Sequence, residues 1–270
     1  MKVTILIDNL SSGSLLSEWG LSIHIDYQGH QILLDTGASD RFVRNAEKLG
    51  IDLKEVEFGV LSHAHYDHAD GMAAFFRCNQ NAPFYLREGS QENCYGKRWI
   101  FHKYIGIRRG YLKQYRDRIH YVKEQQELLP GVSVLAHRPQ SPEVHGDQNH
   151  LYVRQKGRFI PDDFRHEQSL LLDTENGLVI LSSCSHKGAD NIIQEVSFAY
   201  PEKKICAMIG GFHLHRTSEQ EVRALAKRIR SMGIGKIYTG HCTGTSAYET
   251  LKEELGEQVC QIRTGMEMIL

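Results

Sequence analysis

The sequence predicts an α/β protein in which two β-sheets pack between layers of helices. Two observations lead to this fold class. Apolar runs that are typical of strands alternate with helical patterns in two stretches of the 270-residue chain, one before residue 77 and one after residue 160. Several of these runs also end at histidine, aspartate or cysteine, and α/β proteins place their sites at the carboxyl ends of strands. We therefore expect a single domain over residues 1–270 with its functional residues at strand ends.

The first stretch contains four expected strands and two helices. The strands are predicted over residues 2–7, 20–27, 31–37 and 57–61. His24 falls on the polar phase of the second strand, so we expect it at the surface. One helix follows Ser39 or Asp40 as its cap, carries an apolar stripe and stops at Gly50. The other begins near Met72.

Aromatic and basic residues crowd together between about residues 77 and 160, which we interpret as a small lid or subdomain inserted into the core. Within it, Tyr95, Lys97 and Arg98 are the expected substrate contacts. Stacking combined with positive charge favours a flat, anionic small molecule such as a nucleotide or a phosphorylated heterocycle. The alternative is an ordinary solvated surface whose basic side chains lie along it.

The second stretch repeats the pattern of strands and helices. A hairpin is expected over residues 169–181, strands over 204–209 and 236–238, and a helix over 218–232, before a last helix and a strand over 258–263. The hairpin ends at Ser182-Ser183-Cys184-Ser185-His186, and the next strands lead to His213 and His241. Candidate site residues therefore follow three successive strands: His186 and His241 as possible ligands, and His213 as a substrate or proton-transfer residue.

The segment from Ser62 to His68 has the densest set of possible ligands. His63, His65, Asp67 and His68 fall within six positions, directly after the strand over 57–61. Imidazole and carboxylate ligands suit zinc, and also iron or manganese. In an extended segment His63 and His65 point the same way, while Asp67 and His68 can face a second point. Four ligands exceed what one metal with an open position needs, so two adjacent metals are expected.

Four motifs together resemble a known family. They are His-x-His-x-Asp-His, Ser-Cys-Ser-His-x-Gly, Gly-Gly-Phe-His-Leu and Thr-Gly-His-Cys-Thr-Gly, in this order. The set resembles the metallo-β-lactamase superfamily, and within it the dihydropterin-ribofuranosylaminobenzene 5′-phosphate synthase-like metal-dependent hydrolases. The resemblance implies a metallo-β-lactamase-like αββα sandwich.

The resemblance also implies a set of ligands. His63 and His65 would hold one metal with His186 as third ligand, for which His166 is the competing candidate; Asp67, His68 and His241 would hold the other. Cys184 stands where an aspartate that bridges the two metals is expected, and it is either a thiolate ligand or a small buried residue. Asp35, at the end of its strand, would orient a ligand histidine.

The implied function is a metal-dependent hydrolase or transferase. It would use a metal-activated water on a small phosphorylated or pterin- or nucleotide-like substrate, with Asp67 or His213 moving the proton. One or two zinc ions are expected, with manganese or iron as alternatives. A nuclease or thioesterase of the same superfamily is a rival interpretation, as is a metal-containing ligand-binding or sensor protein without turnover.

The composition of the chain bears on its partners and its location. The formal net charge of −1 makes a nucleic acid an unexpected partner, because such binding relies on a basic surface. No apolar run approaches the length of a membrane span, and no signal peptide is evident. Six scattered cysteines fit a reducing cytosol better than a disulfide framework. We therefore expect a cytoplasmic protein with a small anionic substrate; its oligomeric state is left open.

Overall fold

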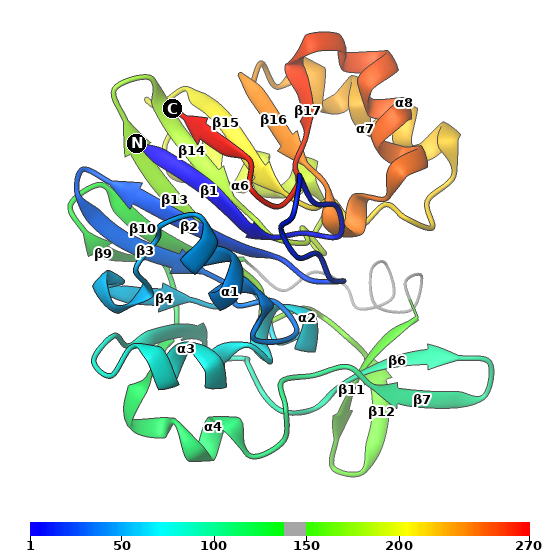
Figure 1. Cartoon of the computed structure of the whole chain (residues 1–270). Coiled ribbons are helices and arrows are strands. Elements are labelled where there is room, and N and C mark those ends of the chain that lie inside the picture. Colours follow the sequence, from blue (N-terminus) through cyan, green and yellow to red (C-terminus); the bar gives the residue numbers. More distant parts are fainter. Residues whose placement is uncertain (138–149) are drawn as a thin grey trace.

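Two seven-stranded sheets lie face to face, with helices on both outer sides (Figure 1). The computed structural model describes residues 1–137 and 150–270, so the part of the expected insert from 138 to 149 lies outside the described residues. A third sheet of four strands lies at one edge of the molecule. The layers are therefore helix, sheet, sheet and helix, as predicted.

The first sheet is antiparallel on one side and parallel on the other. Its order is β18 (Glu267–Ile269), β1 (Lys2–Ile7), β2 (Ser22–Tyr27), β3 (His30–Leu34), β4 (Phe58–Val60), β5 (Phe84–Arg87) and β8 (Ile119–Val122). β18 to β3 pair antiparallel, whereas β3, β4, β5 and β8 pair parallel. The carboxyl ends of β3 and β4 consequently lie side by side.

The second sheet repeats this arrangement. Its order is β17 (Val259–Gln261), β16 (Lys236–Thr239), β15 (Ile205–Gly210), β14 (Gly177–Leu181), β13 (Gln168–Thr174), β10 (Val132–Ala136) and β9 (Gln126–Leu129). The strands from β14 to β17 run parallel, and those from β9 to β14 antiparallel. The parallel strands β14, β15 and β16 therefore end at one edge, where their loops begin.

Apolar side chains fill three layers. Ile23 and Ile25 of the first sheet meet Leu170 and Leu181 of the second in the layer between the sheets. The helices α1 (Arg41–Lys48), α2 (Tyr66–Ala69) and α3 (Met72–Cys78) lie on the side of the first sheet, and α6 (Ala189–Ala199), α7 (Glu219–Ser231) and α8 (Thr245–Leu255) cover the second. Short 3₁₀ turns complete these connections: η1 (Leu53–Glu55), η2 (Arg116–Arg118), η3 (His241–Thr243) and η4 (Gly256–Gln258).

The four-stranded sheet contains only part of the insert expected from the sequence. It consists of β6 (Cys94–Arg98), β7 (Phe101–Tyr104), β11 (Leu151–Gln155) and β12 (Arg158–Pro161). The strands β5, β8, β9 and β10 also fall between residues 77 and 160, but they pair into the two large sheets. The chain therefore leaves the core for β6 and β7, returns through the helix α4 (Tyr111–Gln114), and leaves again for β11 and β12.

Two details differ from the sequence prediction. His24 is buried, not at the surface. It lies between Thr4 of β1 and Leu33 of β3, on the face of the sheet that packs against the helices. The C-terminal strand β18 was not expected; it pairs with β1 through the register Val3 to Met268. Among the described residues, no helix combines the length and apolarity needed to cross a membrane.

Candidate metal centre

Five buried histidines come together where the parallel strands of the two large sheets end. His63, His65 and His68 follow β4, His186 follows β14, and His241 follows β16. Each is at most 6% exposed. The ring of His63 lies 4.6 Å from that of His65, 4.9 Å from that of His186 and 4.2 Å from that of His68, measured between centroids. The loops of both sheets thus build one centre.

The first group of donors consists of His63, His65 and His186. Their ligand atoms all lie within 4.8 Å of one another. Nε2 of His63, Nε2 of His65 and both ring nitrogens of His186 are buried and have no hydrogen-bond partner among the described residues. Unpaired buried nitrogens are costly, and a metal ion bound between the three rings would satisfy them. This donor set therefore fits a metal.

The second group consists of Asp67, His68 and His241. Oδ2 of Asp67 lies 3.5 Å from Nε2 of His241 and 3.8 Å from Nε2 of His68. The rings of His68 and His241 are 5.0 Å apart. One carboxylate oxygen and two imidazole nitrogens facing a common point are ligands of the kind that zinc takes.

Hydrogen bonds set the tautomers of two of these histidines. Nδ1 of His68 donates to Oδ2 of Asp35 over 2.7 Å. The hydroxyl of Ser62 also donates to that oxygen, so it must accept from Nδ1 of His63, 2.8 Å away. Both rings therefore carry their proton on Nδ1 and keep the lone pair of Nε2 toward the centre. A single carboxylate, Asp35, thus orients two donors.

Asn9 plays the same part for His241. Its side-chain oxygen lies 3.0 Å from Nδ1 of His241, and its amide donates to the backbone carbonyl of His241 over 3.1 Å. Nε2 of His241 is thereby turned toward Asp67, 3.5 Å away. Asn9 is the second residue after β1, so this contact joins the end of the first strand to the loop after β16.

The surroundings also favour neutral rings in the first group. Burial, together with the neighbouring imidazoles, lowers the pKa of His63 and His186 well below the usual value. Burial lowers the pKa of His65 to about 3, and nearby His166 acts in the same direction. For His241 burial favours the neutral form, yet Asp67 outweighs it and raises the pKa to about 9. Neutral imidazole is the form that binds a metal.

Cys184 lies between the two groups of donors. Its sulfur is 3.3 Å from Nε2 of His68, and the side chain is buried. The sulfur is also within reach of the donor atoms of His63 and His186. Burial and the adjacent Cys242 raise the pKa of the Cys184 thiol well above its usual value. The sulfur therefore lies close to donors of both groups. A raised pKa favours the protonated thiol, and a nearby cation would favour the thiolate.

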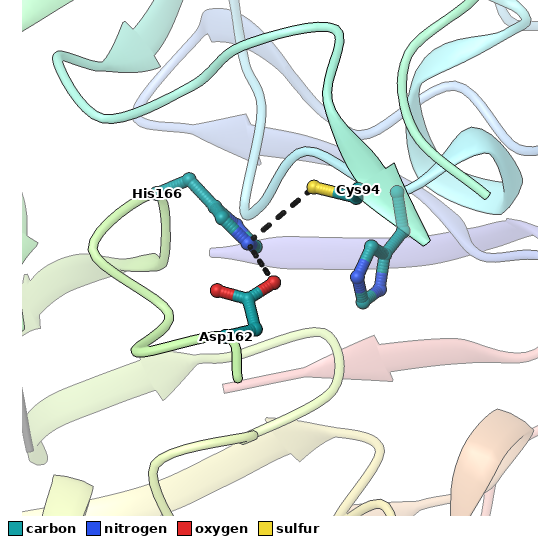
Figure 2. A group of neighbouring side chains, drawn as sticks. Cys94, Asp162 and His166 are labelled. Carbon is teal, nitrogen blue, oxygen red and sulfur yellow. Dashed lines mark hydrogen bonds and ion pairs between the residues drawn. The ribbon is translucent and has the colours of Figure 1, made fainter. Parts of the chain in front are cut away.

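His166 is held differently from His186. Figure 2 shows its ring facing the sulfur of Cys94 and the carboxylate of Asp162; Nε2 is 3.0 Å from Oδ2 of Asp162 and 3.7 Å from Sγ of Cys94. The backbone N–H of Ala64 donates to Nδ1 over 3.2 Å. Because Nδ1 accepts, Nε2 carries the proton and donates to Asp162. Both nitrogens of His166 are engaged, whereas those of His186 are unpaired.

Glu167 holds the loop that carries His186. Its two carboxylate oxygens accept from the backbone N–H groups of His186 and Lys187 over 2.7 and 3.0 Å. Ser185 adopts a φ of 51°, a conformation that few residues other than glycine take. His213 and His241 adopt the same backbone conformation, with φ of 50° and 48°. Strained backbone of this kind gathers at functional sites.

His213 lies beside the centre and is partly exposed. Its ring is 4.2 Å from that of His186, and its buried Nδ1 has no hydrogen-bond partner among the described residues. A cavity of about 240 Å³ opens here, bordered by His65, Asp67 and His213 together with Lys97 and Arg98 of β6. Two of the expected substrate contacts are therefore next to the centre.

Tyr95, the third expected contact, does not border this cavity. It is buried, its ring packs edge to face against Tyr104 and Phe159, and its hydroxyl accepts from Arg109 over 2.9 Å. Its surface and its hydroxyl are thus used inside the small sheet. The expectation that Tyr95 touches substrate is not matched by its place in this structure.

Several residues of the site were not anticipated from the sequence. They are Asn9, Trp19, Lys103, Asp162, Glu167, His215 and Arg216. A signal existed for Asn9, because a polar residue just beyond the end of a buried strand is a recurrent site position. Trp19 lies far in the sequence from the other residues of the cavity, so only the fold brings it there.

Comparison with known proteins gives three results of different weight. A family model described as the metallo-beta-lactamase superfamily matches residues 20–241. One relative is the 7,8-dihydropterin-6-methyl-4-(beta-D-ribofuranosyl)-aminobenzene-5'-phosphate synthase of Methanocaldococcus jannaschii. It is 27% identical to this chain over 262 residues, which cover 92% of this chain and 89% of the relative. The crystal structure of Tm1679, described as a metal-dependent hydrolase of the beta-lactamase superfamily, matches with a TM-score of 0.86 and 28% identity over 100% of this chain and 99% of that one.

A more distant structure shares the fold alone. Zn²⁺-bound PqqB from Methylobacterium extorquens matches with a TM-score of 0.60 at 12% identity, over the whole of both chains.

Proposed function

Because the chain belongs to the metallo-beta-lactamase superfamily, whose members bind metal ions, we propose that it is a metal-dependent hydrolase or transferase. The observation that carries this proposal is the set of buried ring nitrogens without partners that face one another across the centre. An assembly of oriented imidazoles costs stability when it is left unpaired, so its presence favours a metal-binding role over a structural one.

The proposed ligands follow from the two groups of donors. His63, His65 and His186 would hold one ion, and Asp67, His68 and His241 the other, with the sulfur of Cys184 between them. Nitrogen, oxygen and sulfur donors in this ratio favour zinc, with iron or manganese as alternatives. When bound, such ions supply an activated water and polarise the group under attack.

The remaining steps belong to side chains of the protein. Asp35 and Asn9 hold Nδ1 of His68 and His241, and so direct Nε2 of both rings toward the centre. His213, which lies next to the centre and has an unpaired Nδ1, would move a proton to or from the substrate. Asp67 is the alternative proton acceptor, although its carboxylate is already directed at His241.

We propose a small phosphorylated molecule as the substrate. Lys97, Arg98, Lys103 and Arg216 surround the cavity next to the centre, and Asp67 is the carboxylate that accompanies them among its described lining residues. This excess of cations favours an anion. The Methanocaldococcus jannaschii relative is named for an aminobenzene ribofuranosyl phosphate that carries a pterin, which agrees with such a substrate.

The location and the lid form part of the same proposal. The four-stranded sheet supplies Lys97, Arg98 and Lys103 to the cavity, so we assign it the role of a lid over the centre. All six cysteines are free thiols, which suits a reducing cytosol.

The experiment is a chelation and reconstitution assay with a panel of phosphorylated nucleosides and pterins. Product formation should be lost when a chelator removes the metal and should return with one defined metal, zinc first. His63→Ala should not regain activity, while His120→Ala, an exposed control, should behave as wild type. A protein that binds metal and panel compounds but forms no product would be a binding or sensor protein, and the catalytic proposal would fall.

A further inference from the structure

A second cavity borders the candidate centre at His186. It has a volume of about 550 Å³ and lies between α6, α7 and the loop that follows β15. His186, one of the proposed ligands, borders it. Its size falls within the usual range for small-molecule sites, about 300–1,000 Å³. The function proposed above does not use this space.

The two cavities meet at the same residues. His213 and Arg216 border both of them. On the lid side the cavity reaches His65 and Asp67, and on the helix side it reaches His186. The two spaces therefore adjoin at His213, whose ring lies 4.2 Å from that of His186, so a substrate spanning both would pass beside the centre.

The charges of the two cavities differ. On the lid side, Lys97, Arg98, Lys103 and Arg216 stand against the single carboxylate of Asp67 among the described lining residues.

On the helix side, Arg216 and Arg228 are balanced by Asp190 and Glu221. Moreover, Arg228 donates to Asp190 over 2.7 Å, so this cation and this anion satisfy each other. Phe212 and Leu225 add apolar surface. One side thus attracts negative charge, whereas the other is close to neutral and partly apolar.

Resting on the function proposed above, we propose that the substrate is two-sided and that its orientation is set by these cavities. Its anionic end lies on the lid side, and an uncharged, partly apolar portion such as a flat ring occupies the space between α6 and α7. The bond that reacts then lies beside the donors, where the two cavities adjoin. Residues of α7 consequently select the uncharged portion, which neither the motifs nor the metal ligands specify.

The test compares two probes that bind to the metal-loaded protein: inorganic phosphate and adenosine 5′-monophosphate, measured by calorimetry. The nucleotide carries the same anion plus a flat uncharged ring, so it should bind about tenfold more tightly if the ring enters the helix-side cavity. Ala224→Trp, on the exposed rim of that cavity, should remove this advantage and leave phosphate binding unchanged. Thr217→Trp, from a different element of the same lining, should do likewise.

Controls separate this inference from the function on which it rests. Arg230→Trp places the same ring on an exposed position of α7 outside the lining and should change neither affinity. A thermal melt of each variant should match wild type. If neither probe binds wild type, the proposed substrate class fails. If the nucleotide binds more tightly than phosphate and both filling variants retain that difference, the substrate class stands and the orientation proposed here is overturned.

Discussion

Asp35 and His68 are joined by a 2.7 Å hydrogen bond between Oδ2 and Nδ1, and both side chains are completely inaccessible to solvent. Asp35 also accepts from the backbone N–H of Ser62 over 2.7 Å. The carboxylate therefore fixes the loop after β4 as well as the ring. Its φ of 57° shows that the backbone adopts an uncommon conformation to place it there.

The first prediction follows from this contact. Asp35→Asn should weaken metal binding by about 10- to 100-fold, because a proposed ligand loses the carboxylate that orients it. Asparagine tolerates a positive φ, so the backbone should survive the change. Zinc affinity is measured by competition with a chromophoric chelator. Asp26→Asn, on the neighbouring strand β2, is the control and should retain wild-type affinity; equal affinities in all three proteins would remove Asp35 from the centre.

The second prediction concerns metal content. Protein purified without chelator should contain between one and two transition-metal ions per chain. His65→Ala and His241→Ala should each lower that number by about one, since each removes a direct ligand of a different ion. Elemental analysis against protein concentration gives the count, with the exposed His120→Ala as control. Unchanged content in both variants would sink the assignment of ligands.

The third prediction separates His186 from His166. His186→Ala should lower metal content at the first group and abolish turnover, because both of its ring nitrogens are available. His166→Ala should still bind metal at saturating concentration, because its Nδ1 accepts from Ala64 and its Nε2 faces Asp162. Metal analysis and activity of the two variants decide it. The opposite pattern would make His166 the ligand and leave His186 as a neighbour.

The sequence could bring the residues of this centre together because the proposed ligands follow strands. His63, His65 and His68 lie within one short segment, and the motif spacing already reveals their chemistry. The same reasoning led from strand ends to His186 and His241. Asp35 was recognisable as an acid that ends a buried strand. In each case the signal is local, so a single stretch of sequence contains it.

The contacts between distant loops could not be predicted. Ala64 and His166 are 102 positions apart, and nothing near either residue indicates that one donates to the other. The small sheet poses the same problem, since β6 pairs with β11 across a stretch that contains strands of both large sheets. Residue composition distinguished the region between residues 77 and 160, but it could not show which of its strands belong to the small sheet and which to the two large sheets. Tyr95 illustrates the consequence: its aromatic ring suited a binding site, yet the sheet uses it for packing.

His24 was misjudged for a related reason and gives the fourth prediction. Burial lowers the pKa of His24 to about 4 in the folded protein, whereas the ordinary value is 6.5. Between these pH values the unfolded chain binds a proton that the folded protein does not, so the free energy of unfolding falls as the pH decreases through that window. A pKa shift of this size changes the free energy of unfolding by about 3 kcal/mol when the whole window is crossed.

Denaturant unfolding of wild type and His24→Gln at pH 7 and pH 4.5 tests this. The variant should lose less stability on acidification than wild type does, because glutamine cannot take up the proton. His120→Gln replaces an exposed histidine and should lose as much as wild type. Identical losses for all three proteins would show that His24 does not contribute to the pH dependence.

The last prediction concerns the lid. Lys97 and Arg98 are exposed on β6 and border the cavity beside the centre. Replacing both with glutamine should weaken binding of phosphorylated ligands at least about tenfold, because each charge-assisted contact that is lost typically costs that much. Metal content should stay the same, since neither side chain is among the proposed ligands.

A second basic pair provides the comparison for this variant. Arg116 and Lys123 are also exposed and lie outside the lining of the cavity, so replacing them should alter phosphate affinity only slightly and mainly at low salt. Titration of both double variants and wild type with nucleotides and pterin phosphates, at two salt concentrations, distinguishes a binding role from general surface charge. If the two double variants lose the same small amount of affinity, Lys97 and Arg98 form an ordinary basic surface and the lid does not grip the substrate.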